Sequence, residues 1–298
     1  MDTNKIILYS LIIGCLVLLY LIFTKKSSSS VENFASVKVF DTPRKIYGNF
    51  YSKIYDELFF SPVKTNYEAN EIKNYTFKKY KKNDIRIADI GCGTGQTCKN
   101  FDKAGYKTTG LDQSKYMLQK AQENTVSVDL VKGDFMNPNA LPKNQFTHIT
   151  ALFFTVYYTD DVDKFFRNCN GWLKQKGFLC VHLINKKKFD PVLEKASSLL
   201  PLFDPQKYSK KRRTKTELTF DKFKYNSDWN FSKDPVEFVE QFTVNSISAR
   251  KHNHKLYIKP IKVYKKAAIK NGFKLFKIID LTITGHNDNY IYCFQKKF

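Results

Sequence analysis

The sequence predicts an α/β protein with a doubly wound, mostly parallel sheet, because strand-like runs alternate with helix-like stretches. The strand-like runs are residues 85–90 (IRIADI), 107–112 (KTTGLD) and 127–135 (SVDLVKGDF). Strands that alternate with helices at this spacing are typical of parallel sheets, because two parallel neighbours need a crossover between them.

The stretches between these runs have the ends expected of helices. Residues 96–104 predict a helix that stops at Gly105, a residue common just past helix ends. Ser114 is a suitable N-cap for the next helix, and Met117 begins its apolar face. Both helices can therefore cover the predicted sheet.

The carboxyl-terminal third has a different pattern. Residues 215–259 alternate with period two and are rich in aromatic side chains, which predicts antiparallel strands. Residues 260–271 predict an amphipathic helix ending at Gly272, and the rest of the chain predicts two final strands. We therefore expect residues 186–259 to be a strand-rich insertion before the last helix and hairpin.

The amino terminus carries an uncharged apolar run over residues 6–23, nearly long enough to cross a hydrocarbon core of about 30 Å. A cleaved signal peptide is the alternative, but large apolar residues and then two lysines end the run. We expect a transmembrane helix within an anchor at residues 1–26, a tether at 27–40 and a folded domain at 41–298. The basic flank predicts a single-pass membrane protein whose domain faces the cytosol.

The formal net charge of +22 suits an anionic partner, and residues 207–215 (KYSKKRRTK) concentrate six basic side chains. The other lysines are spread along the chain, so a nucleic-acid partner is an alternative that we do not favour. The six cysteines include no CxxC pair, which predicts free thiols and neither a disulfide framework nor a metal site.

The glycine-rich stretch IADIGCGTGQT, residues 87–97, follows the first predicted strand. No lysine follows the glycines, which argues against a P-loop, and Gln96 stands where a dinucleotide fingerprint requires its third glycine. Asp112 ends the second strand, where a carboxylate can accept hydrogen bonds from both hydroxyls of a ribose.

Several motifs in order then resemble one family. D-I-G-C-G-T-G at 89–95, G-L-D-Q-S at 110–114 and G-D-F at 133–135 resemble the class I S-adenosylmethionine-dependent methyltransferases, over roughly residues 47–185. The resemblance implies a seven-stranded Rossmann-like sheet and S-adenosylmethionine as the cofactor. The cofactor-binding residues that it implies are Tyr51, Asp89, Gly91, Cys92, Gly93, Gly95, Asp112, Gln113, Met117, Asp134 and Phe135.

The implied roles differ along the cofactor. The glycines would lie near its amino-acid portion, Asp112 at the ribose and Asp134 at the adenine amino group. The stretch YSKIYDELF at 51–59 resembles the helix that precedes the sheet in small-molecule members, where a tyrosine, here Tyr51, often closes over the methionine end. The predicted fourth strand is residues 146–154 (FTHITALFF). The chain departs from the family there, because Thr147 takes the position where the family often has an aspartate.

Methyl transfer needs alignment and exclusion of water, and a hydroxyl acceptor also needs a base. Tyr157 follows the fourth strand at the edge where ligands bind in open sheets, so it is our candidate catalytic residue. His182 lies in an apolar run and is expected in the core. We expect His252 and His254 in a surface turn, and no third metal ligand is apparent beside them.

The sequence therefore predicts a membrane-anchored methyltransferase of a small molecule. An RNA or protein methyltransferase is the first alternative, although the Asn/Asp-Pro-Pro-Tyr signature of base-methylating enzymes is lacking. A non-catalytic, cofactor-binding membrane scaffold is the second.

Overall fold

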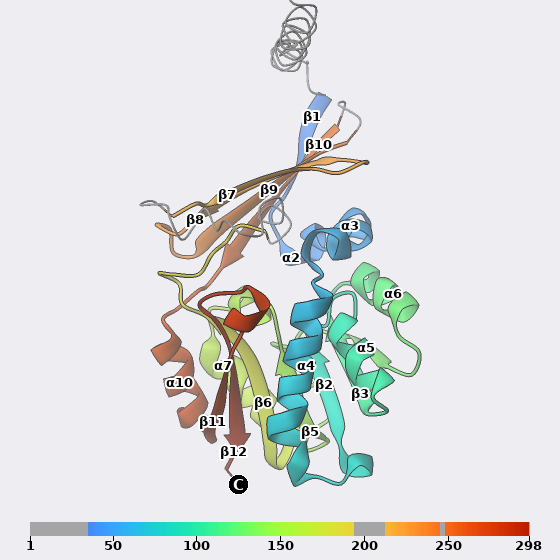
Figure 1. Cartoon of the computed structure of the whole chain (residues 1–298), viewed down its shortest axis with the longest axis vertical. Helices are drawn as coiled ribbons and strands as arrows, with labels where there is room; N and C mark the ends of the chain where they lie inside the picture. Colours follow the sequence, from blue (N-terminus) through green and yellow to red (C-terminus); the bar gives the residue numbers. More distant parts are fainter. Residues whose placement is uncertain (1–34, 194–211, 245–247, 298) are drawn as a thin grey trace, which may run out of the picture.

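The computed structural model describes residues 35–193, 212–244 and 248–297, arranged as two sheets with helices (Figure 1). The larger sheet has seven strands in the order β11-β12-β6-β5-β2-β3-β4. Its strands are β2 (Arg86–Ile90), β3 (Lys107–Asp112), β4 (Asp129–Lys132), β5 (Phe146–Ala151), β6 (Leu173–Ile184), β11 (Phe273–Asp280) and β12 (Asn289–Lys296).

The five strands from β6 to β4 are parallel, and β12 is antiparallel to both β6 and β11. This confirms the predicted seven-stranded, mostly parallel sheet with a final antiparallel hairpin. Every residue of β5 is buried, as expected for the central strand of a sheet covered on both faces.

Successive side chains of a strand point to opposite faces of the sheet, and helices pack against both faces. Ile87 of β2 joins a core cluster with side chains of α4 and α5, whereas its neighbour Ala88 joins a second cluster with α7 and α10. Figure 1 shows α4 and α5 in front of the sheet and α7 behind it. These helices are α4 (Pro62–Thr76), α5 (Gln96–Lys103), α7 (Val162–Trp172) and α10 (Ile261–Lys270).

The predicted helix ends agree with the structure. Gly105 follows α5 with φ +79°, a conformation that glycine adopts without steric cost. The Ser114 hydroxyl accepts a hydrogen bond from the Met117 amide and caps α6 (Lys115–Asn124). The predicted helix at residues 51–59 lies in α3 (Asn49–Phe59), which follows the short α2 (Pro43–Ile46).

The insertion forms most of a second sheet, which we call the cap. Its order is β1-β10-β9-β8-β7, with strands β1 (Ala35–Phe40), β7 (Lys215–Thr219), β8 (Lys224–Asn230), β9 (Val236–Val244) and β10 (Ser248–Leu256). Figure 1 shows the cap above the edge of the larger sheet to which β2 points. The cap thus covers the carboxyl ends of the parallel strands.

One boundary predicted at the amino terminus is wrong. We placed residues 35–40 in a tether, but they form β1 and pair in parallel with β10, with Phe40 opposite His252. The pattern VKVF within this segment is short, and its partner lies far away in the sequence, so local reasoning could not find the strand.

The predicted transmembrane run at residues 6–23 lies outside the described residues. Across the parts of the chain that the structure describes, no helix combines the length and apolarity needed to cross a membrane. The basic run at 207–215 is described only from Arg212 onward. The five described cysteines are free and buried, as the sequence predicted.

Candidate active site

The glycine loop between β2 and α5 begins the site at the carboxyl edge of the sheet. Gly91, Gly93 and Gly95 have φ values of +67°, +55° and +77°, in the left-handed region that favours glycine. The Gly91 amide donates to the Leu111 carbonyl oxygen at 2.7 Å, which ties the loop to β3. A Cβ atom on Gly93 would have no atom within 4 Å, so this glycine faces open space.

Asp112, at the end of β3, holds the loop from the neighbouring strand. Its Oδ2 accepts from the Gly93 amide at 2.9 Å, and its Oδ1 accepts from the Ser114 amide at 2.9 Å. Burial raises the pKa of Asp112, while these backbone hydrogen bonds oppose the rise. An ionised carboxylate offers about four acceptor positions, so two remain for a ligand.

Asp134 follows β4 at the same edge. Its Oδ1 accepts from the Met136 amide at 2.9 Å, an arrangement that holds the side chain in a turn. Phe135 packs edge to face against Phe165 of α7, with ring centroids 5.9 Å apart. Because β4 pairs with β3, the Asp134 carboxylate and the Phe135 ring lie at the same edge of the sheet as Asp112.

These residues line one pocket, which we call the cofactor pocket. Six of the predicted cofactor residues lie there: Gly91, Gly93, Asp112, Gln113, Asp134 and Phe135. The sequence did not identify the other lining side chains of α3 and of the chain after β5. The additional lining residues are Tyr47, Tyr55, Leu111, Gly133, Phe153, Phe154, Thr155 and Tyr158.

Five predicted cofactor residues lie elsewhere. Gly95 packs under the loop against Ala121, and Met117 is buried in a core cluster. Cys92 and Asp89 line a recess on the α4 side of the glycine loop. Tyr51 packs against the cap rather than in the cofactor pocket, and its hydroxyl donates to Glu240 Oε2 at 2.6 Å.

Asp89 is buried beneath the loop. Its carboxylate accepts from the Thr150 hydroxyl at 2.6 Å and from the Cys98 thiol at 3.6 Å. Burial raises the pKa of Asp89 to about 7, although both hydrogen bonds act in the opposite direction. Asp89 therefore supports the loop from below.

Asp56 of α3 is a site residue that sequence reasoning missed. Its carboxylate accepts from the Thr94 hydroxyl at 2.5 Å and from the Gln96 amide group at 2.7 Å. These bonds fasten α3 to the glycine loop. Tyr47, Tyr51 and Tyr55 recur every four residues, and this helical spacing was the available signal for a tyrosine face above the loop.

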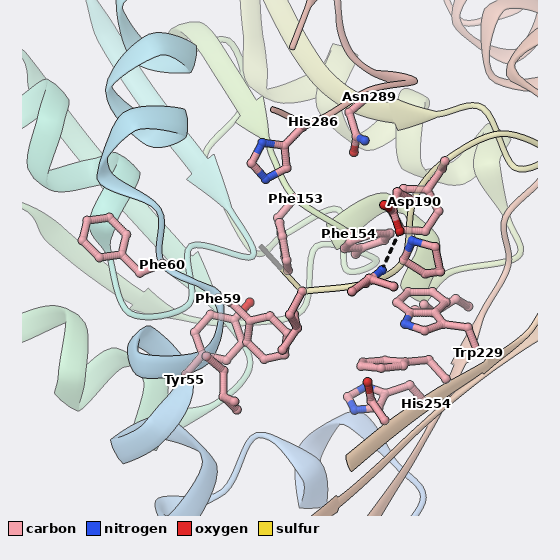
Figure 2. Close-up of a pocket in the computed structure, with 18 of the residues that line it drawn as sticks. Tyr55, Phe59, Phe60, Phe153, Phe154, Asp190, Trp229, His254, His286 and Asn289 are labelled. Carbon is pink, nitrogen blue, oxygen red and sulfur yellow. Dashed lines mark hydrogen bonds between the residues drawn. The ribbon is translucent and has the colours of Figure 1, made fainter. Parts of the chain in front are cut away.

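A second pocket, which we call the acceptor pocket, adjoins the first beneath the cap (Figure 2). It encloses about 910 Å³, including its open mouth, and its lining is mainly aromatic. Figure 2 shows Trp229 and His254 facing the same space as Phe59, Phe153 and Phe154. The two pockets share five side chains: Tyr47, Tyr55, Phe153, Phe154 and Tyr158.

The five shared side chains, which we call the shared wall, include one at a strained backbone position. Phe153 has φ +53°, which is uncommon for a bulky side chain and costs energy. Its ring packs on Phe59 and Phe154, with centroids 5.9 and 4.8 Å away. The fold thus keeps an aromatic ring between the two pockets despite an unfavourable backbone conformation.

Tyr157 does not fit the catalytic role predicted from the sequence. Its side chain is fully buried in the core, and its hydroxyl oxygen accepts a hydrogen bond from the Ile184 amide at 2.7 Å. Its neighbour Tyr158 lines both pockets instead. Consecutive residues of the tight turn η3 (Thr155–Tyr158) point in different directions, and the sequence does not show which one faces the ligand.

His182 is a core residue, as predicted. Its Nε2 lies 3.0 Å from Asn289 Oδ1, its Nδ1 contacts the Phe153 carbonyl oxygen, and burial lowers its pKa to about 3. Contacts with these two oxygens fix the ring beside the shared wall.

The predicted surface turn at His252 and His254 is wrong. Both side chains are buried on one face of β10, and β9 places Glu240 directly opposite His252. Donor atoms of these three residues lie within 4.8 Å of one another, so a third candidate metal ligand is present in space. Burial alone would raise the pKa of Glu240, but hydrogen bonding and charge from the two histidines lower it to about 2.

The fold and the cofactor pocket together define the class of the protein. Residues 88–181 match the family described as Methyltransferase domain. The chain carries a class I S-adenosylmethionine-dependent methyltransferase domain, which confirms the resemblance found in the sequence.

The curated relatives named here match less than half of the chain. A Ubiquinone biosynthesis O-methyltransferase from Pelagibacter ubique is 25% identical over 134 residues, covering 43% of this chain and 55% of the relative. A Malonyl-[acyl-carrier protein] O-methyltransferase from Erwinia pyrifoliae is 40% identical over 60 residues, covering 20% and 22%. The chain thus spans about half the length of the Pelagibacter relative and of similar ones.

Solved structures share the fold over most of the chain. A S-adenosylmethionine-dependent methyltransferase from Clostridium acetobutylicum superposes with a TM-score of 0.62 at 17% identity, covering 84% of this chain and 99% of the other. The CcbJ methyltransferase from Streptomyces caelestis gives 0.62 at 16% identity, covering 85% and 98%. At these identities the likeness concerns the fold.

Proposed function

We propose that the protein uses S-adenosylmethionine to methylate a small molecule held beneath the cap. The aromatic wall common to the cofactor and acceptor pockets carries this proposal. Methyl transfer is an in-line displacement, so the donor and the nucleophile must meet across a boundary that excludes water. Two adjoining pockets with shared side chains meet this requirement.

The cofactor pocket fits an adenosine-containing ligand. Gly93 leaves open space for close approach to the backbone, and Asp112 keeps two acceptor positions for ribose hydroxyls. Asp134 and Phe135 offer this ligand an acceptor for the adenine amino group and an apolar face for its ring. Gln113, which lines the same pocket, would flank that ring. When bound, S-adenosylmethionine supplies the activated methyl group, and the protein supplies orientation.

The lining of the acceptor pocket favours a small molecule with an apolar body. Trp229 and Phe238 of the cap stack with ring centroids 4.2 Å apart, and Phe59 and Phe154 close the other side. The name Ubiquinone biosynthesis O-methyltransferase, carried by several curated relatives, agrees with a small-molecule acceptor. The basic run offers less support for a nucleic-acid substrate, because Arg212 donates to the Lys186 and Phe189 carbonyl oxygens and lies over the Phe231 ring.

We also propose that residues 6–23 anchor the protein in a membrane with its folded domain in the cytosol. The support is the uncharged run and the lysine pair behind it. Residues 24–34 separate this run from β1 and can span at most about 40 Å when extended. The cap, and the acceptor pocket beneath it, would then stay near the membrane surface, where apolar acceptors concentrate.

Calorimetry of the full chain with S-adenosylmethionine tests the cofactor assignment, and methyl-labelled cofactor in a cell lysate tests the acceptor. We expect binding, with label in the lipid or small-molecule fraction. Absence of binding heat would contradict the enzyme proposal. Label in RNA or protein would favour the first alternative, whereas binding without any labelled fraction would favour the non-catalytic scaffold.

Vesicle flotation tests the anchor separately. The full chain is expected to float with phosphatidylcholine vesicles, and a variant lacking residues 2–26 is expected to stay at the bottom of the gradient while binding S-adenosylmethionine equally well. Flotation of both proteins, or of neither, would refute the anchor.

A further inference from the structure

A network of buried polar side chains connects the cap to the acceptor pocket. His254 Nε2 lies 2.8 Å from Glu240 Oε2, and His254 Nδ1 lies 2.7 Å from the Tyr158 hydroxyl. The Tyr158 hydroxyl lies 2.8 Å from that of Tyr47. Glu240, His254 and Tyr158 thus form a continuous hydrogen-bonded chain from the interior of the cap to the shared wall.

The inner end of this chain is fully enclosed. Glu240 is 0% exposed, and both of its oxygens are occupied: Oε1 accepts from the Tyr225 hydroxyl at 3.0 Å, and Oε2 accepts from Tyr51 and His254. A buried carboxylate is retained only when donors compensate its lost hydration. These donors satisfy the carboxylate without an ion, whereas the buried ring nitrogens of His252 have no hydrogen-bond partner among the described residues.

The outer end reaches the point where methyl transfer must occur. Tyr158 and Tyr47 line both pockets, and His254 lines the acceptor pocket. The two partners of His254 define which of its nitrogens carries the proton. The Glu240 carboxylate only accepts, so Nε2–H donates to it, and Nδ1 accepts from the Tyr158 hydroxyl. The Tyr158 oxygen can then accept from Tyr47 and from one further donor in the pocket.

We propose that Tyr158, His254 and Glu240 form a proton relay that deprotonates a hydroxyl group of the acceptor, so that the reaction of this pocket is O-methylation. This inference rests on the proposed function. Tyr158 is the catalytic residue that touches the acceptor, His254 receives the proton, and Glu240 is a positioning residue that stabilises the resulting imidazolium.

The proton and electron balance closes within these groups. The acceptor hydroxyl gives its proton to the Tyr158 oxygen while the Tyr158 proton passes to His254 Nδ1, which leaves an imidazolium beside the Glu240 carboxylate. The acceptor oxygen forms a bond to the methyl carbon, the carbon–sulfur bond breaks, and its electron pair stays on sulfur. The proton on His254 leaves to solvent after product release.

Burial raises the pKa of Tyr158 above its usual value, so its phenol passes a proton on rather than persisting as a phenolate. Burial likewise lowers the pKa of His252, and the neighbouring Glu240 opposes this shift. Every packed element presents titratable or charged groups to the relay. They are Tyr47, Tyr51 and Tyr55 from the amino-terminal helices, Asp112 from β3, Tyr225 from β8, and Arg250 and His252 from β10.

The probe for this inference is 4-nitrophenol, whose phenolate absorbs in the visible range. At a pH where the free probe is mainly phenol, the wild-type chain is expected to bind it as the phenolate, because the relay removes its proton. Tyr158→Phe keeps the ring and loses the hydroxyl, and His254→Gln loses the proton acceptor. Both variants are expected to reduce the bound phenolate at least tenfold.

Tyr225→Phe is the matched control. It also removes a hydroxyl that donates to Glu240, but Tyr225 lines neither pocket and lies outside the hydrogen-bonded path from Tyr158 to His254, so the bound phenolate should persist. The relay is refuted if the wild type does not bind the probe, binds it as the phenol, or gives the same spectrum as Tyr158→Phe and His254→Gln. Equal loss in Tyr225→Phe would also refute it, since any disturbance of the cap would then suffice.

Two further measurements on the same samples separate this inference from its alternatives. Calorimetry with S-adenosylmethionine reports on the proposed function, so normal cofactor binding without a phenolate signal refutes the relay alone. Metal analysis of the purified chain is expected to find no stoichiometric zinc. One zinc per chain, lost in His252→Ala, would make Glu240, His252 and His254 a metal site and overturn the relay.

Discussion

Replacing Asp112 with alanine should weaken the binding of S-adenosylmethionine at least tenfold, or about 1.4 kcal/mol. The carboxylate uses two acceptor positions on the Gly93 and Ser114 amides, which leaves two for the ribose hydroxyls. Alanine removes all four. The expected loss is a lower limit, because hydrogen bonds to a charged group contribute about 1.5–3 kcal/mol each.

The same change also loosens the loop, so stability and affinity must be measured together. Loss of two backbone hydrogen bonds should lower the free energy of unfolding by about 2 kcal/mol. Asp102→Ala is the matched control, since Asp102 Oδ2 also accepts from two backbone amides, those of Val126 and Ser127, at 3.2 Å each. It lies outside the cofactor pocket and should affect stability only.

The assay is calorimetric titration of each full-length variant with S-adenosylmethionine, at a temperature where urea denaturation shows all of them folded. Unchanged affinity in Asp112→Ala would refute the assignment of Asp112 to the ribose. Equal weakening in Asp102→Ala would show that loop stability, rather than contact with the cofactor, controls the affinity.

Other predictions concern the same edge of the sheet. Gly91→Ala should destabilise the chain by about 2 kcal/mol or more in urea denaturation, because the new Cβ would lie 2.6 Å from Thr155 side-chain atoms at φ +67°; adding Thr155→Ala should restore part of the loss. Tyr157→Phe should lower the free energy of unfolding by about 1–3 kcal/mol, because it leaves the Ile184 amide unpaired, and should leave the affinity for the cofactor unchanged. Loss of cofactor binding without destabilisation would contradict this. Asp89 has a pKa of about 7 in the folded chain, above its ordinary 3.8, so the folded chain holds this proton more tightly than the unfolded chain does. The resulting stabilisation of the fold is fully present below pH 3.8 and is lost as the pH rises through 7. Between these values, wild type should lose about 1.4 kcal/mol per pH unit relative to Asp89→Asn, and parallel stability curves for the two proteins would contradict the burial argument.

The cofactor pocket was largely predictable because parallel strands bring their carboxyl ends to one edge. Gly91, Asp112 and Asp134 end or follow consecutive strands, so their meeting follows from topology alone. Tyr51 illustrates the limit of the same reasoning. The helix was correctly placed, but Tyr51 lines the acceptor pocket instead of the cofactor pocket, and its hydroxyl donates to Glu240 of the cap.

The cap could not be predicted in the same way, because its geometry depends on register between distant strands. The spacing of His252, His254 and Leu256 matches one buried face of a strand, a signal that was present in the sequence. Glu240 enters the cluster only because β9 pairs with β10 in a register that sets it opposite His252. No local pattern specifies that register.

The pairing of β1 with β10 has a consequence for how the protein is made. A ribosome releases residues 35–40 well before residues 248–252, so β1 has no partner while the chain between them is made. Closing so long a loop is slow, and the waiting strand edge can pair with other chains. The Rossmann-like strands β2 to β6 can meanwhile associate, so the roof of the acceptor pocket should be completed late in folding, and a chaperone that shields β1 would raise the yield of folded protein.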